Sequence, residues 1–253
     1  MRYTVIVIIS LLLSSISLLK AQVNPADSSV RAFIPNFTFA YQFPGKDMAI
    51  DFGSNATIGG GFFSKSKSNL LLSLDFNYIF GGDIKNEQQI LSMVLNDDGY
   101  IVDGNGTYAL YAVYERGYSF NIRLGKILNL LSVNPNSGVM VMGGVGYLSH
   151  FVKIDNQHQT APQISGDYAL GYDHLRGGLA FNQFIGYYFL GNSRILNFYA
   201  GFEFYQAFTR SIRDYSFDLM KKDTNKYTDL FYGFKIGWMI PIYKRAPRKF
   251  YYY

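Results

Sequence analysis

The chain has 253 residues, of which 49% are hydrophobic, 18% are aromatic and only 16% are charged. Because cysteine is absent, the chain holds no disulfide framework, no thiolate metal site and no lipid-modified cysteine. The formal net charge of +5 comes from basic residues near the two ends of the chain, so it does not indicate a nucleic-acid-binding surface.

Residues 1–21 have the composition of a secretory signal peptide. Arg2 supplies a positive start, an apolar run extends from Val5 to Leu19, and Ala21 precedes a plausible cleavage point. The alternative is an uncleaved anchor helix, but the run is short for a span of about 20 residues. We expect cleavage, followed by an N-terminal segment over residues 22–31.

Eight segments of the remaining chain alternate in polarity with a period of two residues, the pattern of β-strands. They are Ala32–Phe43, Phe52–Phe63, Leu70–Phe80, Tyr118–Lys126, Gly138–His150, Gly178–Phe189, Ile195–Phe208 and Tyr227–Ile242. In the first, third, fourth, seventh and eighth segments, one face is almost purely large and apolar, whereas the other is small, polar or charged.

This patterning separates two kinds of barrel. A soluble lipocalin-like barrel would bury its large apolar side chains, but the interior of a small barrel cannot hold so many Phe and Tyr rings. No later segment offers 18 uncharged apolar residues, so a chain that enters a membrane must do so as a closed barrel. The sequence therefore predicts an all-β, eight-stranded antiparallel transmembrane barrel over residues 32–243.

The connections between these segments differ in length. Residues 64–69, 128–137 and 190–194 form shorter connections, whereas residues 81–117, 151–177 and 209–226 form longer ones. Short turns on one side and long loops on the other are typical of bacterial outer-membrane barrels. An even number of strands returns both termini to the same side, which we expect to be the periplasm.

The layout resembles that of the small OmpA/OmpX-type barrels. The last segment is similar to the signal read by the barrel-assembly machinery, with a polar residue, a glycine two positions later and alternating apolar residues: Lys235, Gly237, Ile240 and Ile242. Residues beyond this motif depart from that pattern, because the signal normally ends the chain. The mature chain also resembles a family of outer-membrane barrels of Bacteroidota, which implies a location rather than an activity.

Four charged residues fall on the less apolar faces of the predicted strands: Asp75, Arg123, Glu203 and Lys235. In an eight-stranded barrel these faces line a lumen that side chains fill. Two acids and two bases are expected to neutralise each other there as a charge plug. The alternative is a path for protons or ions.

The histidines are candidates for catalysis. Ser149-His150 is similar to the serine and histidine of outer-membrane lipid A deacylases, and Asp173-His174 places a carboxylate beside an imidazole. Neither spacing demands catalysis, and loop histidines such as His158 are more often solvated. We predict no catalytic residue and no enzymatic activity.

Acidic loop motifs give a weak metal signal. Residues 97–99 and 103–106 have calcium-like composition but lack the spacing and terminal Glu of an EF-hand loop. Asp-Gly and Asn-Gly are first of all turn formers. We therefore predict no metal, no cofactor and no small-molecule substrate.

Three further segments are candidates for contacts with partners. Glu87–Leu95 has apolar residues at helical spacing, which predicts a short amphipathic helix, and Leu128, Leu130 and Leu131 lie in a predicted periplasmic turn. Residues 244–253 combine basic and aromatic side chains in a candidate partner-binding tail: Lys244, Arg245, Arg248, Lys249, Phe250, Tyr251, Tyr252 and Tyr253.

Together these features predict a non-enzymatic structural or accessory subunit of an envelope machine, such as type IX secretion or outer-membrane protein assembly. Its expected partners are outer-membrane lipid and other outer-membrane or periplasmic proteins. One alternative is a free-standing surface barrel for adhesion or resistance. The other is a lipid A-modifying enzyme.

Overall fold

A computed structural model describes residues 28–158, 160–192 and 195–243, which form one antiparallel barrel. Its strands are β1 (Ala32–Lys46), β2 (Asn55–Lys65), β3 (Leu70–Gly81), β4 (Tyr111–Leu128), β5 (Gly138–Asn156), β6 (Arg176–Leu190), β7 (Asn197–Ser211), β8 (Lys226–Met239) and β9 (Ile242–Tyr243). Short helical turns lie in the connections: α2 (Met48–Asp51), α3 (Glu87–Ile90), η1 (Pro162–Ile164) and η2 (Tyr168–Gly171).

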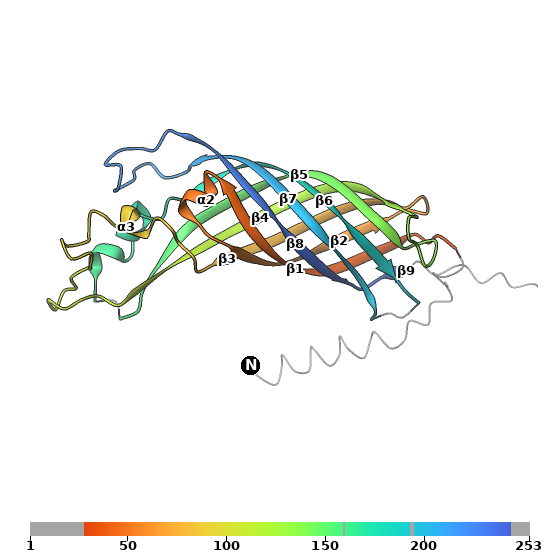
Figure 1. The fold of residues 1–253 in the computed structure, drawn as a ribbon, viewed down its shortest axis with the longest axis horizontal. Coiled ribbons are helices and arrows are strands. Elements are labelled where there is room, and N and C mark those ends of the chain that lie inside the picture. Colours follow the sequence, from red (N-terminus) through yellow and green to blue (C-terminus); the bar gives the residue numbers. More distant parts are fainter. Residues whose placement is uncertain (1–27, 159, 193–194, 244–253) are drawn as a thin grey trace, which may run out of the picture.

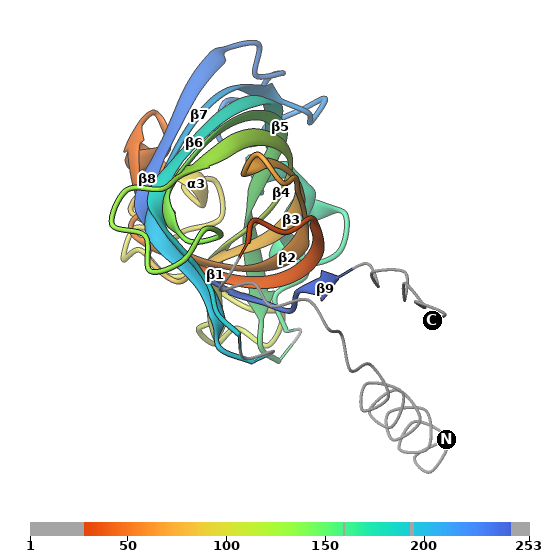
Figure 2. The same ribbon diagram turned by 90° about the vertical axis from the view of Figure 1, so that its right-hand side faces the viewer.

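Pairing between the first and last long strands closes the barrel. Each strand from β1 to β8 pairs with its neighbour in the sequence, and β1 also pairs with β8, so no long strand has a free edge. Figure 1 shows the strands side by side along the long axis, and Figure 2 shows the ring that they form. The eight-stranded antiparallel barrel predicted from the sequence is confirmed.

The two ends of the barrel differ. The β1–β2, β3–β4, β5–β6 and β7–β8 connections gather at one end, which we call the loop end, on the left of Figure 1. The β2–β3, β4–β5 and β6–β7 connections join the strands at the opposite end, which we call the turn end. In the part of the chain that the structure describes, no helix has the length and apolar character needed to cross a membrane.

Several strand boundaries differ from the predicted ones. β4 begins at Tyr111 rather than Tyr118, because Tyr111–Gly117 pairs with an extension of β5 that reaches Asn156. The predicted eighth strand stops at Met239, since Pro241 has no N–H to donate to β1. Ile240 still donates its N–H to Pro35 of β1, and regular pairing with β1 continues in the same register at β9.

The predicted helix over Glu87–Leu95 is shorter in the structure. Only α3 is helical. Its last residue, Ile90, and the following Leu91 are buried, and the chain then continues in turns. The Asn96 side chain accepts the backbone N–H groups of Asp98 and Tyr100, which favours a turn over further helix at this point.

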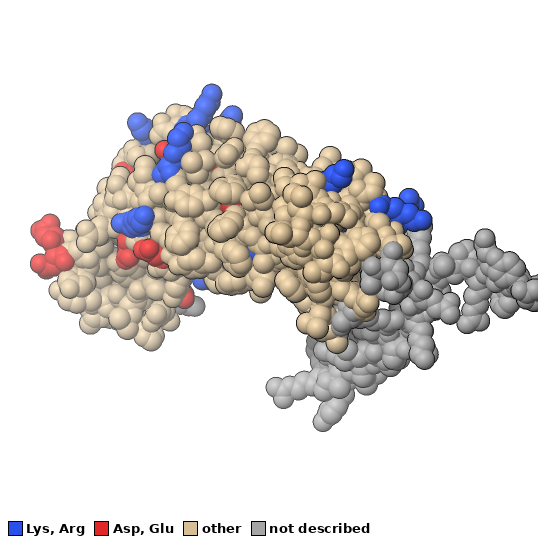
Figure 3. Space-filling model, turned by 45° about the vertical axis from the view of Figure 1, so that its right-hand side comes forward, with Lys and Arg blue, Asp and Glu red and all other residues tan. Residues whose placement is uncertain are grey.

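The outer surface of the barrel is a belt of large apolar side chains. Phe37 of β1 and Phe202 of β7 are 59% and 58% exposed, although each lies in the middle of a paired strand. In Figure 3 the charged side chains lie mainly toward the two ends, with a largely uncharged band between them. Such a belt matches the hydrocarbon core of a bilayer, so the barrel is a transmembrane one.

The interior is filled in three layers. An apolar cluster at the turn end includes Ile34, Phe63 and Met140, and a second one at the loop end includes Phe52 and Leu148. Polar side chains from β3, β4, β7 and β8 occupy the space between them. Polar groups in this middle layer are therefore shielded from water at both ends.

Two facing glycines allow β6 and β7 to approach closely. Gly186 pairs with Gly201, and a Cβ atom on Gly201 would lie 2.2 Å from the carbonyl oxygen of Ile185 and 2.4 Å from Cα of Gly186. A larger residue at either position would push these two strands apart.

Candidate functional site

The four charged residues predicted for the lumen lie together inside the barrel. Arg123 Nη2 is 2.7 Å from Oδ1 of Asp75, and Arg123 Nη1 is 3.0 Å from Oε1 of Glu203. Lys235 Nζ lies 2.8 Å from the same Glu203 oxygen. All four side chains are at most 2% exposed, and they bring β3, β4, β7 and β8 into one network.

Neutral side chains complete the hydrogen bonds of this network. Asn121 Nδ2 donates to Asp75 Oδ2 at 3.1 Å and to the hydroxyl of Tyr205 at 2.7 Å, while Asn77 donates to the same Asp75 oxygen at 3.2 Å. A cavity of about 10 Å³ lies beside the network, next to Glu203 and Tyr205. This volume holds one water molecule at most, so the side chains of the network leave little open space at this point of the lumen.

A buried lysine at the turn end was not singled out from the sequence. Lys65 Nζ donates to Asn136 Oδ1 at 2.8 Å and to the carbonyl oxygen of Val30 at 3.1 Å. Asn136 in turn donates to the carbonyl oxygen of Ser28, so residues 28–30 lie across the turn end of the lumen. The predicted second strand ends at Phe63, two residues before Lys65, whereas β2 continues to Lys65, so the inward orientation of this lysine was not predicted.

Ser149 and His150 do not form a catalytic pair, because neighbouring residues of a strand point to opposite sides of the sheet. Ser149 lies on the outer face and donates to the carbonyl oxygen of Arg176 at 3.1 Å. His150 is fully buried in the lumen, where Nε2 lies 3.0 Å from Oδ2 of Asp229. Thr209 donates to that oxygen too, so the imidazole belongs to a buried polar cluster without access for a substrate.

Glu115 also lies in the lumen toward the loop end, and it was not predicted from the sequence as an inward-facing residue. Asn55 Nδ2 donates to both of its carboxylate oxygens at 3.1 Å, and the Glu115 side chain is completely buried. The predicted fourth strand begins at Tyr118 and does not include Glu115, so the inward orientation of this residue could not be read from the pattern.

Asp173 and His174 have different partners, although they are adjacent in the sequence. Arg213 Nε donates to Asp173 Oδ1 at 3.0 Å, whereas His174 Nε2 lies 3.0 Å from Asp218 Oδ2. Both contacts tie the β5–β6 loop to the β7–β8 loop. His158 is exposed in the β5–β6 loop.

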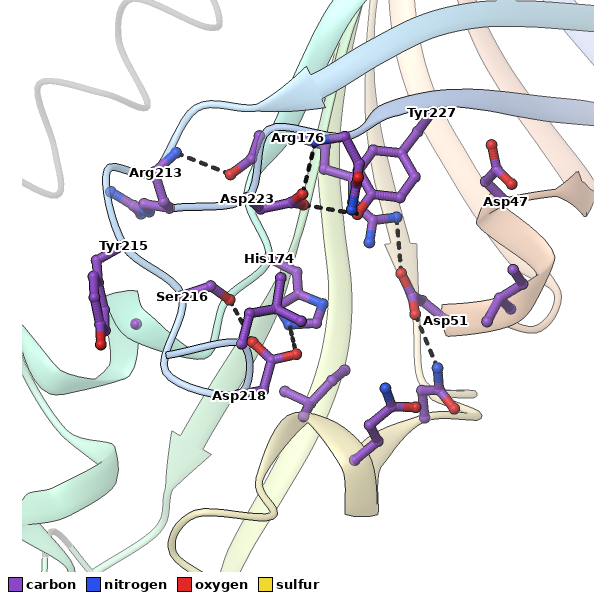
Figure 4. A pocket seen from close by; sticks show the side chains of 18 of the residues that line it. Asp47, Asp51, His174, Arg176, Arg213, Tyr215, Ser216, Asp218, Asp223 and Tyr227 are labelled. Atoms are coloured by element: carbon purple, nitrogen blue, oxygen red, sulfur yellow. Dashed lines mark hydrogen bonds and ion pairs between the residues drawn. The ribbon is translucent and has the colours of Figure 1, made fainter. Parts of the chain in front are cut away.

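These two loops border a cleft at the loop end, shown in Figure 4. The cleft has a volume of about 200 Å³, and its walls come from α2, α3, η2, the start of β6 and the β7–β8 connection. The labelled polar side chains in Figure 4 converge on it from these separate elements. It is the candidate functional site, because it is the place where the loops present converging polar groups to the outside.

Arg176 organises one wall of the cleft. Its Nη1 lies 2.8 Å from Oδ2 of Asp51, and its guanidinium lies 3.7 Å from the centroid of the Tyr227 ring. Asp47 and Asp223 also line the cleft, but within the described residues neither has an ion-pair partner. Asp47 accepts the backbone N–H of Thr228 at 2.7 Å, and Asp223 accepts the Tyr227 hydroxyl at 2.7 Å. The cleft therefore has unpaired negative charge.

Asp218 stabilises the opposite wall of the cleft. Burial raises the pKa of this carboxyl, but hydrogen bonds from His174 and Ser216 lower it by more, so the pKa lies below its ordinary value. Asp218 is therefore ionised at neutral pH.

An apolar groove adjoins the cleft. It is lined by Met93, Pro162, Gln163, Tyr168, Tyr172, Phe217 and Met220. Met93, Tyr168 and Met220 are each more than half exposed, whereas the Tyr172 and Phe217 rings contact each other beneath them, with centroids 5.0 Å apart. We call the cleft and this groove together the loop head.

The acidic motifs of the β3–β4 loop serve as turns. Asp103 Oδ1 accepts the backbone N–H groups of Asn105 and Thr107 at 2.8 and 2.9 Å. Within the described residues, no group of three or more His, Cys, Asp or Glu side chains could hold a metal ion.

The residues proposed for the assembly signal lie in the second half of β8 and beyond. Lys235 points into the lumen, Gly237 packs against the Tyr199 ring, and Ile240 donates its N–H to the carbonyl oxygen of Pro35 at 2.9 Å. Ile242 is half exposed. The tail residues Lys244, Arg245, Arg248, Lys249 and Phe250–Tyr253, like the predicted signal peptide, lie outside the described residues.

A closed antiparallel barrel with an apolar outer belt and a polar, filled interior defines a transmembrane β-barrel of the small outer-membrane type. No model of a protein family matches the chain, and no curated protein matches it either.

Solved structures of similar shape are themselves small barrels. Ail, the attachment invasion locus protein of Yersinia pestis, aligns with a TM-score of 0.44 at 8% identity, over 83% of this chain and 99% of that one. Neisserial surface protein A aligns with a TM-score of 0.43 at 10% identity, over 82% and 96%. The N-terminal barrel domain of Pseudomonas aeruginosa OprF gives 0.36 at 10% identity, over 82% and 97%.

Proposed function

We propose that this protein is a non-enzymatic barrel of a bacterial outer membrane that binds another protein through its loop head. In this arrangement the filled barrel is the anchor, the loop end faces the outside of the cell, and both termini face the periplasm. The observation that carries the proposal is the exposed apolar groove beside the charged cleft.

The apolar groove supplies the main contact area. Met93, Tyr168 and Met220 project from three different loops, so their exposure is not the accident of one mobile segment. Clustered exposed apolar side chains at the tip of a membrane protein are unfavourable in water unless something covers them. Methionine and tyrosine are suited to protein contacts, because they adapt their shape or combine a ring with a hydroxyl.

The cleft supplies specificity. Asp47 and Asp223 leave it with unpaired negative charge, and the groove, lined by neighbouring residues of the same loops, offers apolar surface. A partner that inserts a Lys or Arg side chain into the cleft while covering the groove satisfies both features. We therefore expect the partner to present a basic residue within an apolar surface.

Site-specific photo-crosslinking tests this proposal. A photoreactive amino acid replaces Tyr168 in the groove, and a matched variant carries it at Leu131, which is exposed at the turn end. After irradiation of intact cells, we expect a protein adduct at position 168 that is reduced by Asp47→Asn and Asp223→Asn together. Position 168 without any protein adduct would contradict the proposal.

A second candidate function is that of a subunit held through the turn end. Leu130, Leu131 and Val133 of the β4–β5 turn and Ile195 and Leu196 of the β6–β7 turn are all more than half exposed there. An envelope assembly on the periplasmic side could cover them, with the basic and aromatic tail as a further contact. In the same experiment this function predicts an adduct at position 131 instead of 168.

A further inference from the structure

Two glutamines interrupt the apolar belt of the barrel. Gln183 is the middle residue of β6 and points outward between Phe181 and Ile185. Gln206 of β7 points outward between Phe204 and Phe208. Gln183 pairs with Phe204 and Gln206 pairs with Phe181, so the two amides are diagonal neighbours on one patch of the outer surface.

Neither amide has a hydrogen-bond partner among the described residues. Other polar residues of the outer face are accommodated. Arg116 and Ser149 donate to backbone carbonyl oxygens, and Lys126 lies two residues from the end of β4, where its long side chain reaches the headgroups. An amide in hydrocarbon without a partner is costly, because lipid chains neither donate nor accept hydrogen bonds.

A groove in the same surface adjoins Gln183. The residue opposite Gln183 on β5 is Gly143, and no heavy atom lies within 4 Å of the position that a Cβ atom would take there. Leu124, Val141 and Ile185 form the apolar walls of this groove. The patch thus combines a hollow that accepts apolar side chains with two amides that need partners.

We propose that this patch of β5, β6 and β7 is the interface for a second copy of the same chain in the membrane. Two copies inserted in the same direction are related by a twofold axis along the membrane normal, which brings each residue to its own counterpart at equal depth. An amide is self-complementary, because it carries both donors and an acceptor, whereas two equal charges would repel. Gln183 and Gln206 can therefore pair across such an axis, and apolar side chains enter the Gly143 hollow.

Cysteine crosslinking in native membranes tests this interface directly, because the chain has no cysteine of its own. Gln183→Cys is compared with Phe39→Cys, which is exposed on the outer face of β1, a strand that does not adjoin the patch. On mild oxidation we expect disulfide-linked dimers of the Gln183→Cys protein only. Equal crosslinking of both variants, or none at position 183, would overturn the proposal.

A second measurement tests the same interface without an introduced cysteine. The Gln183→Leu, Gln206→Leu double variant keeps the belt apolar and should insert normally, which heat-modifiable migration on gels verifies. Its dimer dissociation constant, measured by energy transfer in lipid vesicles, should rise roughly three- to tenfold for each amide pair lost. An unchanged constant, or capture of a different protein at position 183, would contradict a second copy as the occupant.

Discussion

Arg123 and Glu203 face each other across the lumen, with Nη1 and Oε1 3.0 Å apart. Arg123 also binds Asp75, and Lys235 binds Glu203, so the two basic side chains and two acidic side chains neutralise each other. The network joins strands that are not neighbours in the sheet, which makes it both a filling for the lumen and a brace between opposite walls.

Loss of Arg123 should destabilise the barrel strongly. Arg123→Ala leaves the Asp75 carboxylate without an ion pair and weakens the charge balance of Glu203, which should lower the free energy of unfolding by about 3–5 kcal/mol. Urea unfolding in lipid vesicles measures this change. Lys222→Ala is the control, because its pair with Asp214 is exposed to solvent and should contribute little to stability. Equal effects of the two substitutions would show that the network is not a brace.

The filled lumen should not conduct ions. The central network lies between two apolar layers of buried side chains, and an eight-stranded barrel has an interior that side chains can fill. Purified protein in planar bilayers should therefore show no stable single-channel currents. Persistent large currents that scale with the amount of inserted protein would refute this interpretation.

Acidification should loosen the β7–β8 loop. The pKa of Asp218 is below its ordinary value, so its contacts with His174 and Ser216 stabilise the loop head fully above pH about 4. That contribution is lost as the pH falls through the lowered pKa, when the carboxylate becomes protonated. Hydrogen exchange of residues 212–225 should rise in this acidic range, and Asp218→Asn should raise exchange already at neutral pH and remove the dependence. A loop equally protected at both pH values would contradict this role.

Ser149 and His150 should have no part in lipid chemistry. Their side chains lie on opposite faces of β5, and His150 is enclosed with Asp229. Mass spectrometry of lipid A should give the same composition with the native protein, with Ser149→Ala and without the protein. A lipid A species that depends on Ser149 would restore the enzymatic alternative.

The strand alternation carried most of the information about the fold. A two-residue period fixes which side chains point inward, so the lumen positions of Asp75, Arg123, Glu203 and Lys235 followed once the strands were recognised. The same argument failed for Glu115, because Tyr111–Gly117 alternates less clearly and extends beyond the belt. Proline explains the early end of β8, although its effect was not anticipated.

The loop head could not be predicted from the sequence. Asp51 and Arg176 are far apart in the chain, and only the closure of the barrel brings α2 beside the start of β6. The groove likewise combines Met93, Tyr168 and Met220 from three loops, whose relative positions no local pattern encodes. Gln183 and Gln206 are visible in the sequence, but only the structure places both of them on one patch of the apolar outer belt.

Labelling of single cysteines in intact cells tests the central claim, a membrane-embedded barrel with its loop head outside. Because the chain has no cysteine, Tyr168→Cys, Phe202→Cys and Leu131→Cys each report one position. A membrane-impermeant maleimide should label position 168 in intact cells and position 131 only after the outer membrane is permeabilised. Position 202 should react only with a probe dissolved in lipid. Labelling of 131 but not 168 in intact cells, or ready aqueous labelling of 202, would contradict the account.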